Sequence, residues 1–354
     1  MKRRFILSCS LALVASLGLT GCGSNASAEA DGSKTLNIYA WAGEIPDSIV
    51  KDFAAETGIK VTVDTFDSNE TMIAKLQAGN SGYDVVEASQ YAVGLLADRK
   101  LIAEIDQTRV EGLENLADKF ADPSYDPGNR HSIPWAWGTT GILYNEKCTN
   151  SPVTGWADMW NEAYKGKVYM LDNMLSAYIA GLQIDGLSAT STDEADIAKA
   201  TDRLLAQKPM LAGYNSTNYA DLIAVGDACI AQSYSGTVAA KAVENNEDVH
   251  YILPKEGGTL WTDSFSVVTG TKSEDAAYAW LNYTLKPEIA ARLTDEASLA
   301  TPNQAAQKLV KDQSLVSNSA IYAPEGDLEH AEFIVDPGAA LSFYQSGWTR
   351  VRAS

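Results

Sequence analysis

Alternation between β-rich runs and helical segments is the feature that most limits how this chain can fold. After residue 34, three runs rich in branched and aromatic residues read as strands, at Thr35–Trp41, Val61–Phe66 and Tyr83–Glu87. Helical periodicity fills the intervals, from about Asp47 and over residues 69–78. A β-α-β-α-β series of this kind forms a parallel sheet with right-handed crossovers. The sequence therefore predicts an α/β fold.

The ends of these runs are the first places to look for binding residues. In an open α/β sheet, ligands lie outside the carboxyl ends of the strands. Trp41 ends the first run, and Ser89 and Tyr91 follow the third. We therefore expect these three side chains to lie at a ligand site.

A second α/β region is expected after Ile133–Tyr144, an apolar run interrupted by glycine that we interpret as the strand leaving a first lobe for a second. Further strands are expected at 167–172, 229–234, 251–254 and 265–268, and helices at 156–164, 175–181, 197–207, 238–244, 274–285 and 287–293. The chain has 354 residues, 45% of them hydrophobic, which is enough for two domains.

The stretch 254–265 suggests what one end of a ligand could be. A Gly-Gly turn leads to Trp261 and, two residues later, Asp263, whose side chains share one side of the chain if the segment is extended. An indole face attracts a cation by ~0.5 to 2 kcal/mol, and a carboxylate adds a charge-assisted hydrogen bond. The pair therefore suits an ammonium group. The alternative is a core tryptophan beside an aspartate that caps a loop.

The amino terminus indicates export. Residues 1–21 combine three basic residues, an apolar run and small residues, as secretory signal peptides do. The sequence Leu-Thr-Gly-Cys ending at Cys22 resembles the bacterial lipobox, which implies cleavage before Cys22 and a lipid on its sulfur that holds the protein at a membrane. The run is shorter than the ~20 apolar residues that a membrane-spanning anchor needs. Residues 22–34 are rich in small polar residues and predict a flexible tether.

The charge of the chain favours cationic solutes over nucleic acid. The formal net charge is −19, and removal of the three basic residues of the signal peptide would make it −22. A surface this acidic repels phosphate backbones, so we expect no nucleic-acid partner. Solubility alone is an equally good reason for the charge.

Cysteine and histidine usage argues against metal or cofactor chemistry. Outside the signal and the lipobox there are two cysteines, Cys148 and Cys229, which could form a disulfide outside the cytoplasm or stay free. The three histidines lack metal-ligand spacing, and no nucleophile elbow, dinucleotide or phosphate loop occurs. We therefore expect no metal, no cofactor and no enzyme activity.

Several stretches, in order along nearly all of the mature chain, carry a family resemblance. They are 36–45, 66–72, 82–86, 132–134 with 137–138, 154–160, 254–258 with 261–264, and 300–306. Together they resemble the bacterial periplasmic spermidine/putrescine-binding proteins. The resemblance implies two α/β lobes joined by hinge strands, a solute held in the cleft between them, and delivery to an ABC permease. We place lobe 1 at residues 35–141 with 263–307 and lobe 2 at 142–262 with 308–354, and expect a monomer.

The resemblance also implies a set of binding residues. Positions that match the family's ligand contacts are Trp41, Ser89, Tyr91, Trp261 and Asp263, with Tyr234 as the aromatic from the second lobe. Other positions depart from the family. Glu44 stands where the family has tyrosine, and Asn173 and Ser176 stand where it has the acidic pair that holds inner amines. Ile334 replaces a glutamine.

These departures leave the far end of the solute open. A buried ammonium without a carboxylate costs several kcal/mol, so a polyamine needs a second acid, for which Glu44 and Asp172 are candidates. Each also has a purely structural interpretation, as an acid at a helix N-terminus or a helix cap. The alternative solutes have one amine and a neutral or anionic end, such as an amino acid or an opine. A sensory lipoprotein of the same fold is a further alternative.

Overall fold

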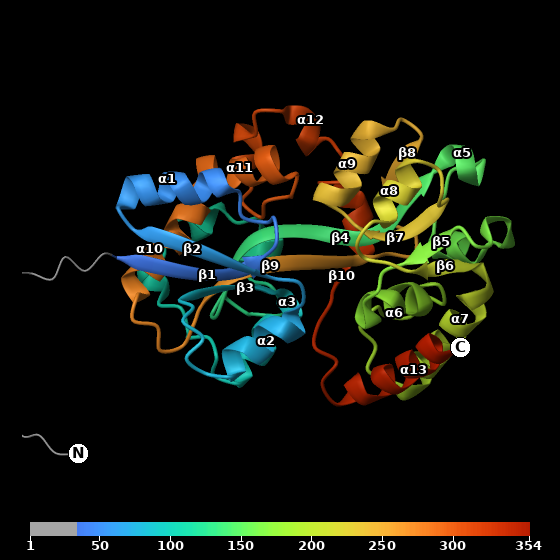
Figure 1. Ribbon diagram of the computed structural model, residues 1–354, viewed down its shortest axis with the longest axis horizontal. Coiled ribbons are helices and arrows are strands. Elements are labelled where there is room, and N and C mark those ends of the chain that lie inside the picture. Colours follow the sequence, from blue (N-terminus) through green and yellow to red (C-terminus); the bar gives the residue numbers. More distant parts are fainter. Residues whose placement is uncertain (1–33) are drawn as a thin grey trace, which may run out of the picture. The chain divides into compact units, whose positions relative to one another are not determined.

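Strands β1 to β10 form one mixed sheet with helices on both faces (Figure 1). The computed structural model describes residues 34–354, so the predicted signal peptide, Cys22 and all of the tether but Lys34 lie outside the described residues. The strands are β1 (Thr35–Trp41), β2 (Lys60–Phe66), β3 (Val85–Ser89), β4 (Ile133–Asn145), β5 (Val168–Met170), β6 (Leu211–Tyr214), β7 (Ile230–Tyr234), β8 (Val249–Ile252), β9 (Thr259–Val267) and β10 (Glu332–Phe333).

The strand order combines parallel and antiparallel pairs. It runs β2-β1-β3-β9-β4-β7-β5-β6, with β10 beside β9 and β8 beside β4. Strand β1 is parallel to β2 and β3, as the β-α-β-α-β series predicts, and β9 returns antiparallel to β3 and β4. The long strand β4 pairs with β9 near its start and with β7 and β8 near its end. Strand β4 therefore links the two halves of the sheet.

The helices follow the strands along the chain. They are α1 (Asp47–Thr57), α2 (Asn69–Gln77), α3 (Gln90–Asp98), α4 (Asp118–Ala121), α5 (Glu146–Thr149), α6 (Met174–Gln183), α7 (Glu194–Gln207), α8 (Tyr219–Ala224), α9 (Thr237–Asn245), α10 (Glu274–Leu285), α11 (Pro287–Ala297), α12 (Gln313–Val316) and α13 (Leu341–Ala353), with short 3-10 turns between them.

Period-2 alternation along the strands divides the core between the two faces of the sheet. In β1, Leu36 and Ile38 pack with α1, α10 and α11 on one face, whereas Tyr39 packs with α2 and α3 on the other. The second half repeats this arrangement, with α6, α7 and α13 on one face and α8 and α9 on the other (Figure 1). The architecture is thus two α/β lobes. The lobe boundaries at 141/142, 262/263 and 307/308 stay a prediction.

Three local predictions were wrong. The strand expected at 265–268 begins earlier, at Thr259, because the segment pairs with β4 from there, so Trp261 and Asp263 lie within a strand. The stretch 156–164 forms two 3-10 turns rather than one helix, because the extended residue Asn161 ends the first and caps the second. Strand β6 and helix α8 were not predicted, since both are short.

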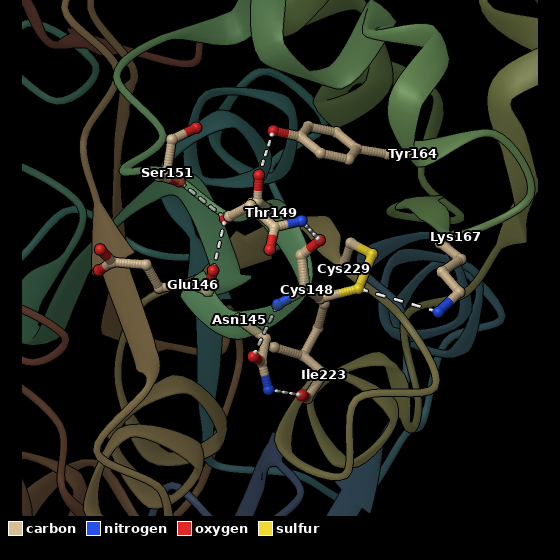
Figure 2. Close-up of a disulfide and its surroundings, with 10 residues drawn as sticks. Asn145, Glu146, Cys148, Thr149, Ser151, Tyr164, Lys167, Ile223 and Cys229 are labelled. Atoms are coloured by element: carbon tan, nitrogen blue, oxygen red, sulfur yellow. Dashed lines mark hydrogen bonds between the residues drawn. A yellow bond between two sulfur atoms is a disulfide. The ribbon is translucent and has the colours of Figure 1, made fainter.

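A disulfide joins Cys148, in α5, to Cys229, just before β7 (Figure 2). The two Cα atoms are 5.1 Å apart across a sequence separation of 81 residues. The Lys167 ammonium lies 3.9 Å from the Cys148 sulfur. Of the two alternatives that the sequence left open, the structure has the bond, and it fastens the end of β4 to the strand beside it.

Candidate functional site

The candidate site lies where β1 and β3 end beside β9. Ser89, the last residue of β3, is directly opposite Asp263 in the antiparallel register. The Ser89 hydroxyl donates a hydrogen bond of 2.6 Å to Asp263 Oδ1. Asp263 lies on the same face of β9 as Trp261 and Phe265, as the two-residue spacing predicts for an extended segment. Two residues predicted from separate parts of the sequence are therefore in contact.

Asp263 is a buried carboxylate with unused acceptor capacity. It is 5% exposed, and burial raises its pKa to about 6, while the hydrogen bond from Ser89 and the nearby Trp41 indole oppose the shift. The Trp41 indole nitrogen is buried and influences the carboxylate without reaching hydrogen-bond geometry. A carboxylate has about four acceptor positions. Asp263 is thus ionised at neutral pH and can accept further donors.

Glu44 reaches the same place through a tight turn after β1. Gly43 has a positive φ of 86°, and the Glu44 amide donates to the Trp41 carbonyl at 3.5 Å. The Trp135 indole holds the turn by donating to the Glu44 carbonyl at 3.3 Å. Glu44 precedes α1, which begins at Asp47, so it is not an acid of the first helical turn. The alternative of a helix-end acid is therefore wrong.

Glu87 is a third carboxyl group at the site, and sequence reasoning missed it. It is 0% exposed on β3, and its Oε2 accepts the Trp41 amide at 3.0 Å. Burial, followed by the charge of Asp263, raises the pKa of both glutamates well above the usual value. The charge of Glu87 also raises the pKa of Glu44, so the two carboxyl groups lie close to each other. The only signal in the sequence is an acid inside an apolar run.

No basic side chain neutralises this carboxyl cluster, which we define as Glu44, Glu87 and Asp263. Among residues 34–354, none of the ion pairs includes any of the three. A buried charge without a partner is costly, so such a cluster must be neutralised either by protons or by a cation from outside the chain. In the same part of the chain, no three His, Cys, Asp or Glu side chains are arranged to hold a metal ion.

Aromatic side chains lie around the carboxyl cluster. The Trp261 ring covers Gly138, where an added Cβ would be 2.2 Å from the ring, and its indole nitrogen donates to the Thr139 carbonyl at 3.1 Å. Trp41 packs against Phe66 with ring centroids 4.6 Å apart. Glycine at position 138 is thus what allows Trp261 to lie flat against β4.

One tyrosine of the second lobe, Tyr234, lies near the cluster, and Tyr91 of the first lobe lies near Tyr234. Burial and the charge of Asp263 raise the pKa of Tyr234, which ends β7 in the second lobe. Burial also raises the pKa of Tyr91, in α3. The nearby Tyr234 adds to this rise. The Tyr91 hydroxyl accepts from Asn69 at 3.0 Å and lies 3.3 Å from the Glu70 carboxylate. Tyr234 therefore connects the cluster to the second lobe.

The second-lobe residues form an uncharged group. Asn173 caps α6 by accepting the Ser176 amide at 3.0 Å, and the Ser176 hydroxyl lies 2.9 Å from the Tyr234 hydroxyl. Asp172 is not part of this group, because it pairs with Arg352 at 2.8 Å. The acid that was a candidate for the far end of a polyamine thus has an internal partner.

Gln90 is another residue of the site that the sequence did not reveal. Its side-chain oxygen accepts the Thr262 amide at 3.0 Å, and its nitrogen donates to the Leu260 carbonyl at 3.4 Å. These bonds tie the start of α3 to the strand that carries Trp261 and Asp263. Gln90 therefore helps to position the side chains of Trp261 and Asp263 by holding the backbone beside them.

Comparison with known proteins identifies the family. The model of the bacterial extracellular solute-binding proteins matches residues 48–321. This chain belongs to that family. The spermidine/putrescine-binding periplasmic protein of Escherichia coli K12 is 32% identical over 328 residues, which cover 92% of this chain and 94% of the relative.

Solved structures of other solute-binding proteins agree. The spermidine/putrescine ABC transporter substrate-binding protein PotD of Streptococcus pneumoniae has a TM-score of 0.82 and 30% identity, covering 91% of this chain and 99% of that one. The PotD lipoprotein of Treponema pallidum has a TM-score of 0.81 and 27% identity, covering 90% and 100%. The fold of this solute-binding protein is therefore that of the periplasmic binding proteins.

Membership of this family agrees with export from the cytoplasm. No helix in the described part of the solute-binding protein is both long and apolar enough to cross a membrane.

Proposed function

We propose that this protein captures a protonated polyamine, putrescine or spermidine, outside the cytoplasm and delivers it to an ABC permease. The observation that carries the proposal is the carboxyl cluster, which is buried and has no cation of its own. Primary ammonium groups have pKa values near that of lysine, about 10.4, so both ends of a polyamine are charged at neutral pH. Relatives that cover most of the chain are named for the same solutes.

Binding would close the two lobes on the solute. Trp41 and Asp263 would hold one ammonium group from the first lobe, while Tyr234 would contact the ligand from the second. A ligand that touches both lobes stabilises only the closed state, which the permease would recognise. We infer further that the protein acts as a monomer, is lipid-anchored through Cys22 and catalyses no reaction.

One observation favours a second candidate. Asn173, Ser176 and Tyr234 carry no charge at neutral pH, and Asp172 is paired with Arg352. A solute with one amine and a neutral or anionic end, such as an amino acid or an opine, would match this group better than a second ammonium would.

Calorimetric titration of the purified protein distinguishes the two candidates. Putrescine, spermidine, a matched set of amino acids and an opine are each titrated at neutral pH. The proposal expects saturable binding of a polyamine and much weaker binding of the others. Binding of an amino acid or an opine with no response to either polyamine would replace the first candidate by the second.

A further inference from the structure

The starting observation is an unused oxygen on the buried side chain of Glu87. Its Oε2 accepts the Trp41 amide, but its Oε1 is buried and has no donor in the structure. Glu87 is 0% exposed and none of the described ion pairs includes it. A charged group left in this state is unfavourable by several kcal/mol. The side chain therefore needs either a proton or a cation.

Glu44 presents the complementary oxygen. Its Oε2 is also buried without a donor, although the residue as a whole is partly exposed. The two carboxyl groups lie close enough for each to shift the pKa of the other, and neither can donate a hydrogen bond when ionised. One proton shared by the pair satisfies both oxygens. The two carboxyl groups therefore titrate as a unit.

Within residues 34–354, the other groups that face the cluster carry no positive charge. They are Tyr125 from the loop before β4, Tyr234 from β7, and the uncharged Ser89 and Trp41 at the ends of β3 and β1. Strand β4, which packs against β9, has no charged side chain between Ile133 and Asn145. The shared proton is thus the charge that can leave when a cation arrives.

We propose that Glu44 and Glu87 form, next to Asp263, a proton-exchanging subsite for a primary ammonium group. The pair holds one proton while the site contains no cation, and it releases that proton to solvent as the ammonium binds. The inference rests on the proposed function and adds to it the residue Glu87, the second carboxyl group of the subsite, and a coupling between solute binding and proton release.

The exchange is balanced in atoms and charge. The O–H bond of the protonated carboxyl group breaks, and the proton passes to water or buffer. The resulting carboxylate accepts an N–H of the ammonium, which stays protonated because its pKa is far above neutral. A positive charge a few ångströms away favours the ionised carboxyl group, which is the direction that the exchange requires.

The test is calorimetric titration of the purified protein with putrescine and with spermidine at neutral pH, in phosphate and in Tris. The two buffers differ in their heats of protonation, so the difference in binding heat counts the protons released. We expect release of about one proton per bound polyamine, and affinity that rises between pH 5 and 8. Binding heats that are equal in the two buffers after correction, with affinity independent of pH, would overturn the inference while leaving the proposed function intact.

Two variants and a control locate the source of the proton. Glu87→Gln and Glu44→Gln keep side-chain shape while removing one titrating group, and each should reduce the number of released protons to near zero. If one variant fails to fold, the other gives the same test. Glu104→Gln, which removes an equal charge from a surface pair with Arg130, should release protons as the wild type does. If both cluster variants release as many protons per bound polyamine as the wild type, the proton comes from another group and the inference is overturned.

Failure of the proposed function has a different outcome. If neither polyamine binds the wild-type protein in either buffer, the proposed function is wrong. The proton-exchanging subsite is then wrong as well, because it rests on that function. If a polyamine binds without proton release, only the exchange is wrong.

Discussion

The two lobes differ in the charge of the side chains at their strand ends. At the ends of β1 and β3, three carboxyl groups meet, and none of the ion pairs formed within residues 34–354 includes them. At the end of β7 and the start of α6, the polar groups are neutral and bonded to one another, and the acid nearby is paired with Arg352. One lobe is therefore poised to recognise charge, and the other offers neutral hydrogen-bonding groups.

The largest expected effect is on the free energy of unfolding, and it tests whether the disulfide of the second lobe stabilises the fold without affecting ligand affinity. Replacing both Cys148 and Cys229 by serine removes the bridge across 81 residues and should lower the free energy of unfolding by about 2 to 4 kcal/mol. Polyamine affinity should stay within about twofold, because the bridge is remote from the carboxyl cluster. Urea denaturation and calorimetry measure the two quantities. A large loss of affinity without loss of stability would break the comparison.

The next effect tests the charged lobe directly. Asp263→Asn keeps the shape of the side chain but removes a charge-assisted hydrogen bond of ~1.5 to 3 kcal/mol. Affinity for putrescine should fall by about tenfold to a hundredfold. Calorimetry of both proteins at neutral pH measures the loss. An affinity equal to that of the wild type would show that Asp263 does not bind the ammonium group.

A smaller effect concerns the ligand-free protein. The carboxyl pKa values of the cluster are raised in the folded state, so the stability they contribute is fully present below about pH 4, the unfolded value, and is lost as pH rises through the folded values. For Asp263 this window lies between about pH 4 and 6. Melting temperature should therefore fall as pH rises from 4 to 7, and less steeply in Glu87→Gln. Equal slopes in the two proteins would show that Glu87 does not titrate as inferred.

The smallest effect sharpens the contrast between the lobes. Asp172→Asn breaks an ion pair whose side chains are 46% and 44% exposed, and such pairs contribute about 0 to 1 kcal/mol. We expect little change in stability and none in polyamine affinity. Calorimetric titration of Asp172→Asn and Asp263→Asn with the same polyamine compares the affinities of the two variants. An affinity loss similar to that of Asp263→Asn would mean that Asp172 leaves Arg352 to meet the ligand.

The sequence predicted those parts of the site that depend on local periodicity. Alternation along an extended segment places Trp261 and Asp263 on one side, and strand ends pointed to Trp41 and Ser89. The strand was predicted to begin only at residue 265 because the Gly-Gly pair suggested a turn before it, whereas pairing with β4 extends the strand back to Thr259.

The carboxyl cluster could not be predicted from the sequence. Glu44 and Glu87 belong to different βα units, and only the pairing of β1 with β3 brings them together. Each glutamate alone looks like an ordinary acid at the end of an element. The partnership of Asp172 with Arg352 is equally non-local, because it depends on how α13 packs against α6 and α7.

A crystal structure of the protein grown with putrescine tests the central claim most directly. The account predicts one ligand nitrogen within about 3 Å of the Asp263 carboxylate, beside the Trp41 and Trp261 rings and in reach of Glu44 or Glu87. A solute bound elsewhere, or one that turns a carboxylate or a neutral end toward Asp263, would contradict it.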